Sequence, residues 1–354
     1  MINLKDIKPN VPKANIEDYV FTIYGRPKSG KTTLFANLTK EFYGDVNKGL
    51  LLGFEAGYNA LEVLAAPIHS WSDFVEAVDQ LIEEKDELPY KFIGIDTADI
   101  AYQYATEYII RKKKIEDSKP YKAIGDIPYG QGYDLTDKEM SRQFTRIQKA
   151  GYGLMFISHD NDKKFTSRDG VEYDKTTISL PNRPRNTVLN MSDFILFIDI
   201  AKEKDENDKL NDKRYIYFRA DGSDLEAGSR FKNVPVKIEY DVNLFIKTFE
   251  DAVLSSLNES LVGIDNKIDV EKIKKEQKKE KEKKAEEFIE KEKVEISANS
   301  LIAEIGQTIK GLEADKKKEA GAIFEEMFGA PTKYKECEDV EALQEAIERL
   351  NALK

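Results

Sequence analysis

The chain has 354 residues, of which 40% are apolar, and it carries a net charge of −11 at pH 7. This length predicts two or three domains, and the apolar fraction is large enough to bury a core. A single cysteine excludes a framework of internal disulfides, the first residues lack the blocks of a secretory signal, and no apolar stretch approaches the roughly 18–20 residues that cross a bilayer. We therefore expect a cytoplasmic protein with no membrane partner. The charge argues against a uniformly basic nucleic-acid coat protein, so any DNA contact must come from local basic segments.

The first predicted elements flank a glycine-rich loop. The apolar run 19–24 predicts a strand, and the amphipathic stretch 30–43 predicts a helix. Between them, residues 25–32 read G-R-P-K-S-G-K-T, a complete G-x-x-x-x-G-K-[ST] sequence. Its glycines let the backbone turn, so that successive N–H groups and the positive end of the helix face a phosphate. The segment is therefore interpreted as a phosphate-binding loop.

This loop predicts ATP and Mg²⁺ as cofactors. Lys31 is expected to reach the β- and γ-phosphate oxygens and to act in catalysis, and Thr32 is expected to hold Mg²⁺. The residues predicted to bind the nucleotide are Gly25, Arg26, Pro27, Lys28, Ser29, Gly30, Lys31, Thr32 and Thr33.

Strand-like and helix-like segments alternate from residue 19 to about residue 200, which is typical of a parallel α/β sheet. The predicted strands are 19–24, 49–54, 90–96, 153–158 and 193–200. The predicted helices are 30–43, 71–85, 97–115 and 136–151, the last opened by a capping box at Thr136 and Glu139. Strand-like runs at 213–219 and 234–240 and a helix at 243–259 complete the core.

Two carboxylates are expected at the ends of buried strands. Asp96 ends the run 90–96 and is predicted to be the second Mg²⁺ partner, although the same position also suits a helix N-cap. Glu55 follows the run 49–54 and is predicted to act on the attacking water, the alternative being a surface carboxylate. Ring-forming remodelling ATPases place a glutamate directly after the metal-binding aspartate. Here Thr97 stands there, which argues against that class.

A histidine and an arginine complete the predicted catalytic set. His159 follows the strand 153–158 and is expected to sense the γ-phosphate, the alternative being a hydrogen-bonded loop anchor. Arg230 lies in a turn and is expected to reach the γ-phosphate of a neighbouring subunit, the alternative being a local salt bridge.

Two segments combine cations with aromatic residues, a pattern that suits single-stranded DNA through phosphate neutralisation and base stacking. The first follows a helix predicted to end near residue 110, and the second follows His159. The candidate DNA-binding residues are Lys112, Lys113, Arg168, Arg183 and Arg185. A basic run is also typical of a solvated helix end, which remains the alternative.

The composition changes after residue 260. Residues 271–295 contain 10 Lys and 9 Glu, which favours a solvated helix, and their apolar residues are too sparse for a coiled-coil seam. Helical spacing of apolar residues then predicts a three-helix module. The predicted organisation is a P-loop core over 1–260, a Lys/Glu-rich helical spacer over 261–296 and an all-α module over 297–354. The module is acidic, which favours contact with protein over DNA.

The chain resembles the RecA-fold ATPases, and more closely the phage nucleotide-binding proteins described as single-strand annealing ATPases. The resemblance covers about residues 15–250 and is carried by residues 25–33, 54–57, 95–97, 156–159, 180–185 and 227–230. It implies a RecA-like P-loop core that binds single-stranded DNA in an ATP-dependent manner and anneals complementary strands. It also implies a single-strand DNA-binding protein as partner and a homo-oligomer with ATP at subunit interfaces, in the cytoplasm of a bacterial host. Glu55 carries over as the hydrolytic carboxylate and His159 as the sensor.

Two other functions fit the same sequence. A P-loop kinase for a small molecule or nucleotide would use Arg183 and Arg185 as lid residues. A regulatory ATPase would control a protein partner bound by residues 296–354.

Overall fold

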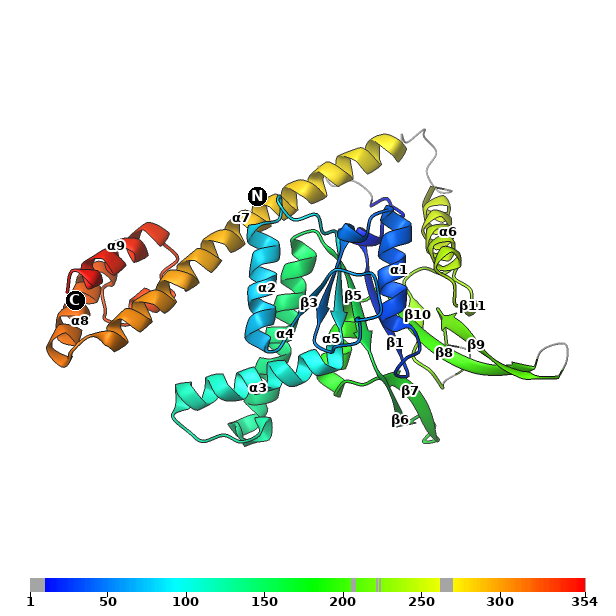
Figure 1. Ribbon diagram of the computed structural model, residues 1–354, viewed down its shortest axis with the longest axis horizontal. Coiled ribbons are helices and arrows are strands. Elements are labelled where there is room, and N and C mark those ends of the chain that lie inside the picture. Colours follow the sequence, from blue (N-terminus) through cyan, green and yellow to red (C-terminus); the bar gives the residue numbers. More distant parts are fainter. Residues whose placement is uncertain (1–9, 205–207, 221, 223, 262–269, 354) are drawn as a thin grey trace. The chain divides into compact units, whose positions relative to one another are not determined.

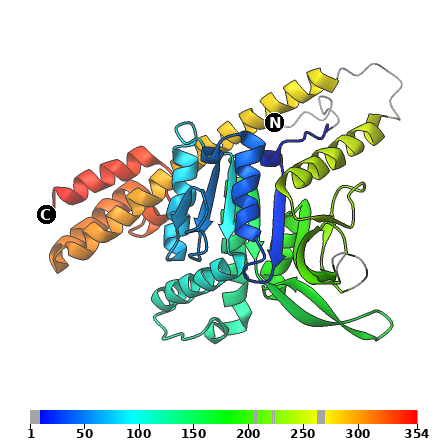
Figure 2. The same ribbon diagram turned by 45° about the vertical axis from the view of Figure 1, so that its right-hand side comes forward.

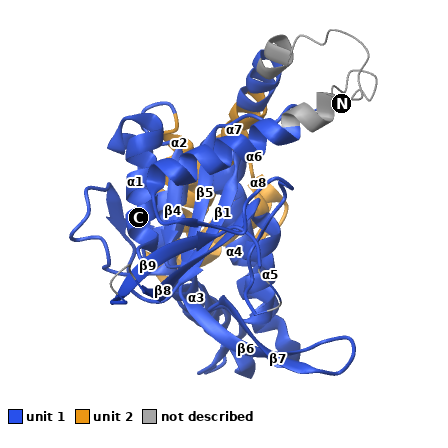
Figure 3. Ribbon diagram, turned by 90° about the vertical axis from the view of Figure 1, so that its right-hand side faces the viewer, with its two compact units in different colours: residues 1–78, 86–282 blue, residues 79–85, 283–354 orange. Residues whose placement is uncertain are grey.

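The computed structural model describes residues 10–204, 208–220, 222, 224–261 and 270–353. The chain divides into two compact units, one formed by residues 1–78 and 86–282 and the other by residues 79–85 and 283–354 (Figure 3). The first unit contains the sheet and the glycine-rich loop.

The central sheet has the strand order β11-β9-β8-β1-β5-β4-β2-β3, with β10 beside β8 (Figure 1). Its strands are β1 (Val20–Gly25), β2 (Gly49–Gly53), β3 (Ala65–Pro67), β4 (Phe92–Asp96), β5 (Gly153–Ser158), β8 (Phe194–Lys204), β9 (Leu210–Tyr217), β10 (Gly228–Ser229) and β11 (Lys237–Glu239). The strands from β8 to β3 in this order run parallel, whereas β9, β10 and β11 pair antiparallel. A separate hairpin joins β6 (Asp160–Thr166) to β7 (Glu172–Ile178). The predicted α/β fold with a largely parallel sheet and C-terminal helices is confirmed.

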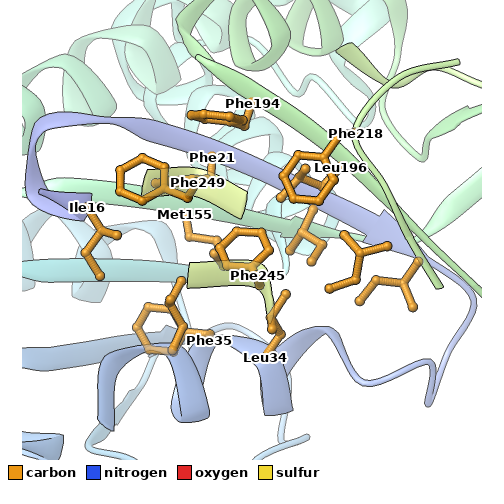
Figure 4. Close-up of a cluster of buried hydrophobic side chains, with 14 of the residues drawn as sticks. Ile16, Phe21, Leu34, Phe35, Met155, Phe194, Leu196, Phe218, Phe245 and Phe249 are labelled. Atoms are coloured by element: carbon orange, nitrogen blue, oxygen red, sulfur yellow. The ribbon is translucent and has the colours of Figure 1, made fainter. Parts of the chain in front are cut away.

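Helices cover both faces of the sheet. They are α1 (Lys31–Tyr43), α2 (Trp71–Glu83), α3 (Ala98–Asp117), α4 (Gln131–Lys149), α5 (Asn182–Met191) and α6 (Val242–Leu261), with short 3₁₀ turns η2 (Ile16–Asp18), η3 (Val46–Lys48), η4 (Ile124–Asp126) and η5 (Pro128–Gly130). One face packs against α1 and α6 in a cluster that includes Phe21, Leu34 and Phe245 (Figure 4). On the other face, Phe144 of α4 meets Phe156 of β5 with ring centroids 4.8 Å apart.

The central strands are buried along their whole length, which explains why their sequences read as continuous apolar runs. Alternate residues serve opposite faces: Met155 belongs to the α1 and α6 cluster, while its neighbour Phe156 points to α4. Because β1, β2, β4 and β5 run parallel, their carboxyl ends meet at one edge of the sheet.

Three sequence predictions need correction. Helix α4 begins at Gln131, so Thr136 lies inside it and donates its hydroxyl to the Gly132 carbonyl at 3.0 Å instead of capping the helix. Helix α3 continues to Asp117, so the first basic segment begins on a helix and not in a loop. The β6–β7 hairpin was missed because its strands are largely solvated and lack an apolar face.

The second unit is helical. It contains the later part of α7 (Val270–Gly311), α8 (Ala314–Phe328), the turn η6 (Lys333–Glu336) and α9 (Val340–Asn351), which pack around a core that includes Ile305, Phe324 and Leu343. Helix α7 continues without interruption through residues 296 and 297, so the predicted boundary between spacer and module coincides with no break in secondary structure. Residues 262–269 of the predicted spacer lie outside the described residues. Within the described part of the chain, no helix combines the length and the apolar character that a membrane span requires.

Candidate nucleotide site

The glycine-rich loop connects β1 to α1, and its backbone geometry demands its glycines. Gly25 has a φ of 154° and Gly30 a φ of 107°, values that side-chain-bearing residues rarely adopt. At Gly25 a Cβ atom would lie 2.5 Å from the carbonyl oxygen of Ile198 in β8. Gly30, the N-cap residue of α1, has no side chain to cap the helix. The first-turn N–H groups of α1 are therefore available to an anion.

Lys31 is folded back over this loop. Its Nζ donates to the carbonyl oxygens of Gly25 at 2.7 Å and Arg26 at 2.9 Å. Burial lowers the pKa of the ammonium group, and the surrounding carboxylates of Asp96, Asp160, Asp99 and Glu55 oppose that shift. The amine lies at the mouth of the loop, where it could exchange these carbonyls for phosphate oxygens.

The side-chain oxygen of Ser29, inside the glycine-rich loop, tests whether the loop fits a polar ligand. Ser29 is fully buried, and its Oγ has no hydrogen-bond partner among the described residues. A Cβ on Gly25 would approach this same oxygen at 3.2 Å. Buried hydroxyl groups are normally satisfied, so the Ser29 hydroxyl has hydrogen-bonding capacity that a phosphate in the loop could use. The residues present therefore fit a bound triphosphate.

The expected metal ligands are already in contact. Thr32 Oγ1 donates to Asp96 Oδ2 at 2.7 Å. Burial raises the pKa of Asp96 to about 6, and the negative charge of Glu55 adds to this shift while the hydrogen bond from Thr32 opposes it. A carboxylate, a hydroxyl and phosphate oxygens form the hard oxygen set that Mg²⁺ prefers.

Backbone hydrogen bonds bring Glu55 to the same edge. The N–H groups of Phe54 and Glu55 donate to the carbonyl oxygen of Asp96 at 2.6 Å and 3.1 Å. These bonds tie the end of β2 to the end of β4. The Glu55 side chain is half exposed, and its Oε2 lies 3.7 Å from Nε2 of His159.

The imidazole of His159 is held by Asp99, a residue that the sequence analysis missed. Nδ1 of His159 lies 2.9 Å from Asp99 Oδ2. This hydrogen bond is the main cause that raises the pKa of His159. Burial acts to raise the pKa of Asp99, but the hydrogen bond and charge of His159 outweigh it and hold that pKa below its usual value. The available signal was the position of Asp99 in the first turn of α3, three residues after Asp96.

Arg230 is not brought to this site. Its Nη2 donates to the Asn190 carbonyl at 2.8 Å, and its Nε lies 3.4 Å from Asp193 Oδ1. Asp193 in turn accepts from the N–H of Val20, the first residue of β1. The P-loop follows the last residue of β1, so Arg230 lies at the opposite end of the strand from its own P-loop.

The candidate DNA-binding residues fall on three separate elements. Lys112 and Lys113 lie on α3, where Lys113 pairs with Asp117 at 2.9 Å. Arg168 is exposed in the turn between β6 and β7. Arg183 and Arg185 lie on α5.

The two α5 arginines have acidic partners. Arg183 is exposed and pairs with Asp134 of α4. Arg185 is largely buried, pairs with Glu226 and donates from Nε to Thr177 Oγ1 at 2.9 Å. These partners lie on α4, on β7 and just before β10, not in the P-loop.

A parallel sheet that carries a glycine-rich phosphate loop, a hydroxyl–carboxylate pair and a strand-end glutamate defines the class of P-loop nucleoside triphosphatases. The AAA domain family model matches residues 17–231, more than half of the chain, so the protein belongs to the AAA domain family. This family supplies a nucleotide-binding and nucleotide-hydrolysing core that is usually loaded with Mg²⁺. A search of curated proteins found no match to the chain.

Proposed function

We propose that the protein is an ATPase of phage DNA recombination or replication, which binds single-stranded DNA and promotes annealing of complementary strands. The observation that carries the ATPase part is the convergence at one edge of the sheet of Lys31 at the start of α1, Asp96 at the end of β4 and His159 just after β5. Thr32 and Glu55 complete this group.

The arrangement supports hydrolysis with each residue in a separate role. Bound Mg²⁺ would supply positive charge to the phosphate oxygens, with Thr32 and Asp96 as its protein ligands. Glu55 is exposed enough to accept a hydrogen bond from an attacking water and to orient it. Asp99 fixes the ring of His159 and favours its imidazolium form, in which Nε2 also carries a proton and directs it to the side where Glu55 lies. A phosphate oxygen would compete with Glu55 for that proton, which links nucleotide state to the start of β6.

Charge and exposure favour the first basic segment as the DNA surface. Residues 111–133 contain six Lys and Arg against three Asp and Glu, an excess of positive charge in a chain of net charge −11. Tyr129 is 98% exposed and Tyr133 is 44% exposed, so both rings are open to stack with bases. The segment therefore combines the two features that bind single strands.

The β6–β7 hairpin has weaker support. Residues 160–178 contain four Lys and Arg against five Asp and Glu, so the hairpin carries no excess of positive charge. The hairpin and the C-terminal half of α3 extend from the P-loop edge of the sheet to different sides (Figure 1, Figure 2). We therefore assign DNA binding first to Lys112 and its neighbours and only secondarily to Arg168.

Assembly is part of the proposal. Arg230 is 61% exposed in its side chain and lies away from its own P-loop. A second copy of the chain could accept this guanidinium at its γ-phosphate, which would place ATP at a subunit interface. A single-strand DNA-binding protein is the further proposed partner.

The test measures ATP hydrolysis with and without single-stranded DNA, together with annealing of fluorescently labelled complementary strands. We expect DNA to stimulate hydrolysis and Lys31→Ala to abolish both activities. A matched Lys40→Ala variant should keep both, because Lys40 pairs with Glu62 at the surface of the same helix. Phosphate transfer to a nucleoside acceptor without DNA stimulation would instead identify a kinase.

A further inference from the structure

Tyr240 lies beyond the segment that the AAA domain family model matches, yet it touches the P-loop. It follows β11 and precedes α6. Its hydroxyl donates to the carbonyl oxygen of Gly30 at 2.7 Å. A Cβ on Gly30 would lie 3.0 Å from that hydroxyl and 3.1 Å from the ring carbon that bears it. The ring is therefore seated directly against this glycine.

The Gly30–Lys31 peptide group, which belongs to the phosphate-binding loop, accepts this hydrogen bond. The Gly30 carbonyl is the first acceptor of α1 and also accepts from the N–H of Leu34 at 2.8 Å. In a planar trans peptide the C=O bond and the following N–H bond point in opposite directions. Holding the Gly30 oxygen therefore fixes the direction of the Lys31 N–H, one of the unpaired donors at the start of the helix.

Tyr240 is itself held firmly. Its backbone N–H donates to the carbonyl oxygen of Arg214 in β9 at 2.9 Å. The next helix, α6, places Phe245 in the same core cluster as Leu34 of α1. Burial raises the pKa of the Tyr240 hydroxyl to about 12, so it keeps its proton and stays a donor at neutral pH.

We propose that Tyr240 is a positioning residue of the nucleotide site, whose hydroxyl aims the Gly30–Lys31 peptide N–H at a bound phosphate. This inference rests on the proposed ATP-binding function and extends the site to the segment that joins β11 to α6. The ring also leaves little room for a Cβ at position 30, where the φ of 107° already favours glycine.

The test compares Tyr240→Phe with Tyr43→Phe. Tyr43 stands at the other end of α1, is half-buried, and donates its hydroxyl to Glu17 at 2.8 Å, so its variant also removes one tyrosine hydrogen bond from the same helix. Both variants keep the aromatic ring and therefore the packing. The measurements are the Kd for Mg²⁺–ATP, the kcat and KM of hydrolysis, and the Tm without nucleotide.

We expect Tyr240→Phe to raise the Kd and KM by about threefold to tenfold, the worth of one hydrogen bond, with kcat changed less than KM. Tyr43→Phe should leave the Kd and KM at their wild-type values, while both variants lower the Tm to a similar extent. Wild-type binding with equal Kd values in all three proteins would overturn the role of Tyr240 and leave the ATPase proposal standing. Absence of Mg²⁺–ATP binding by the wild-type protein would overturn both.

Discussion

The carboxylate of Asp99 holds one ring nitrogen of His159 at 2.9 Å, while the other ring nitrogen faces Glu55 at 3.7 Å. The three side chains come from the first turn of α3, the end of β5 and the end of β2. A carboxylate that accepts a hydrogen bond from Nδ1 fixes the orientation of the ring and favours the imidazolium, the form in which the other nitrogen also carries a proton and can donate. Asp99 therefore positions His159 beside Glu55, the residue proposed to orient the attacking water.

We expect Asp99→Asn to lower the rate of ATP hydrolysis by about 10- to 100-fold, because a donor aimed at developing charge loses its orientation. The wild-type rate should fall as the pH rises through the raised pKa of His159, since the imidazolium is then lost. In the variant this fall should begin at a lower pH. An unchanged pH profile would contradict the role of Asp99. Asp45→Asn is the control, because Asp45 caps η3 before the amino end of β2.

Asp96→Asn should make the nucleotide-free protein more stable at pH 8. The folded-state pKa of Asp96 is raised from 3.8 to about 6, so the folded state binds the proton more tightly than the unfolded state does. Stability is therefore lost as the pH rises from about 4 to about 6, and the loss persists above that range. Removing the charge should restore about 1–3 kcal/mol in the free energy of unfolding at pH 8, and about 1 kcal/mol less at pH 5. Urea unfolding at the two pH values measures this.

The same variant should lose the Mg²⁺ dependence of nucleotide binding, which separates the ligand role of Asp96 from its effect on stability. In the wild-type protein, protons should compete with Mg²⁺, so the apparent Mg²⁺ affinity should decline below about pH 6. Titrations of Mg²⁺ at pH 5 and pH 8 test this competition. Equal affinity at both values would show that Asp96 is no ligand.

Arg185 and Arg183 lie on the same helix, but we expect their ion pairs to contribute differently to stability. The side chains of Arg185 and Glu226 are 12% and 15% exposed, so Arg185→Ala removes the guanidinium group from a largely buried carboxylate. We expect a cost of about 1–3 kcal/mol in the free energy of unfolding, because Thr177 and Lys175 still contact the Glu226 carboxylate. Arg183 and Asp134 are 59% and 54% exposed, and Arg183→Ala should cost less than about 1 kcal/mol. Denaturant unfolding of both variants gives the comparison, and equal costs would be inconsistent with it.

Tyr129→Asn should weaken binding of single-stranded DNA by about 5- to 100-fold, the range of one lost stacking contact. Asparagine suits this position because the backbone φ of Tyr129 is 58°. The Tm should be unchanged, since the ring is 98% exposed. Val171→Asn, which alters an exposed residue of the β6–β7 hairpin, is the control and should bind DNA as the wild type does. A reversed result would transfer the DNA surface to the hairpin.

The P-loop and the strand that ends in Asp96 could be predicted from sequence because their signals are local. Glycines, a lysine and a threonine in one octapeptide define the phosphate loop, and buried parallel strands have continuous apolar runs. The order of strands along the chain then implies that Glu55, Asp96 and His159 lie at one edge. Secondary-structure boundaries were less secure, as α4 shows: helical side chains such as Thr136 resemble caps when only their neighbours in sequence are considered.

Only the tertiary structure decided which side chains meet across long stretches of chain. Asp99 and His159, Arg185 and Glu226, and Tyr240 and Gly30 are far apart in sequence, and no local pattern marks any of these pairs. The same holds for Arg230, whose distance from its own P-loop depends on the pairing of β10 with the amino end of β8. The sequence by itself determined the chemistry of the phosphate loop, because that depends on backbone conformation over eight residues. The partners of the charged and polar side chains depend on burial and strand order, which are properties of the folded chain.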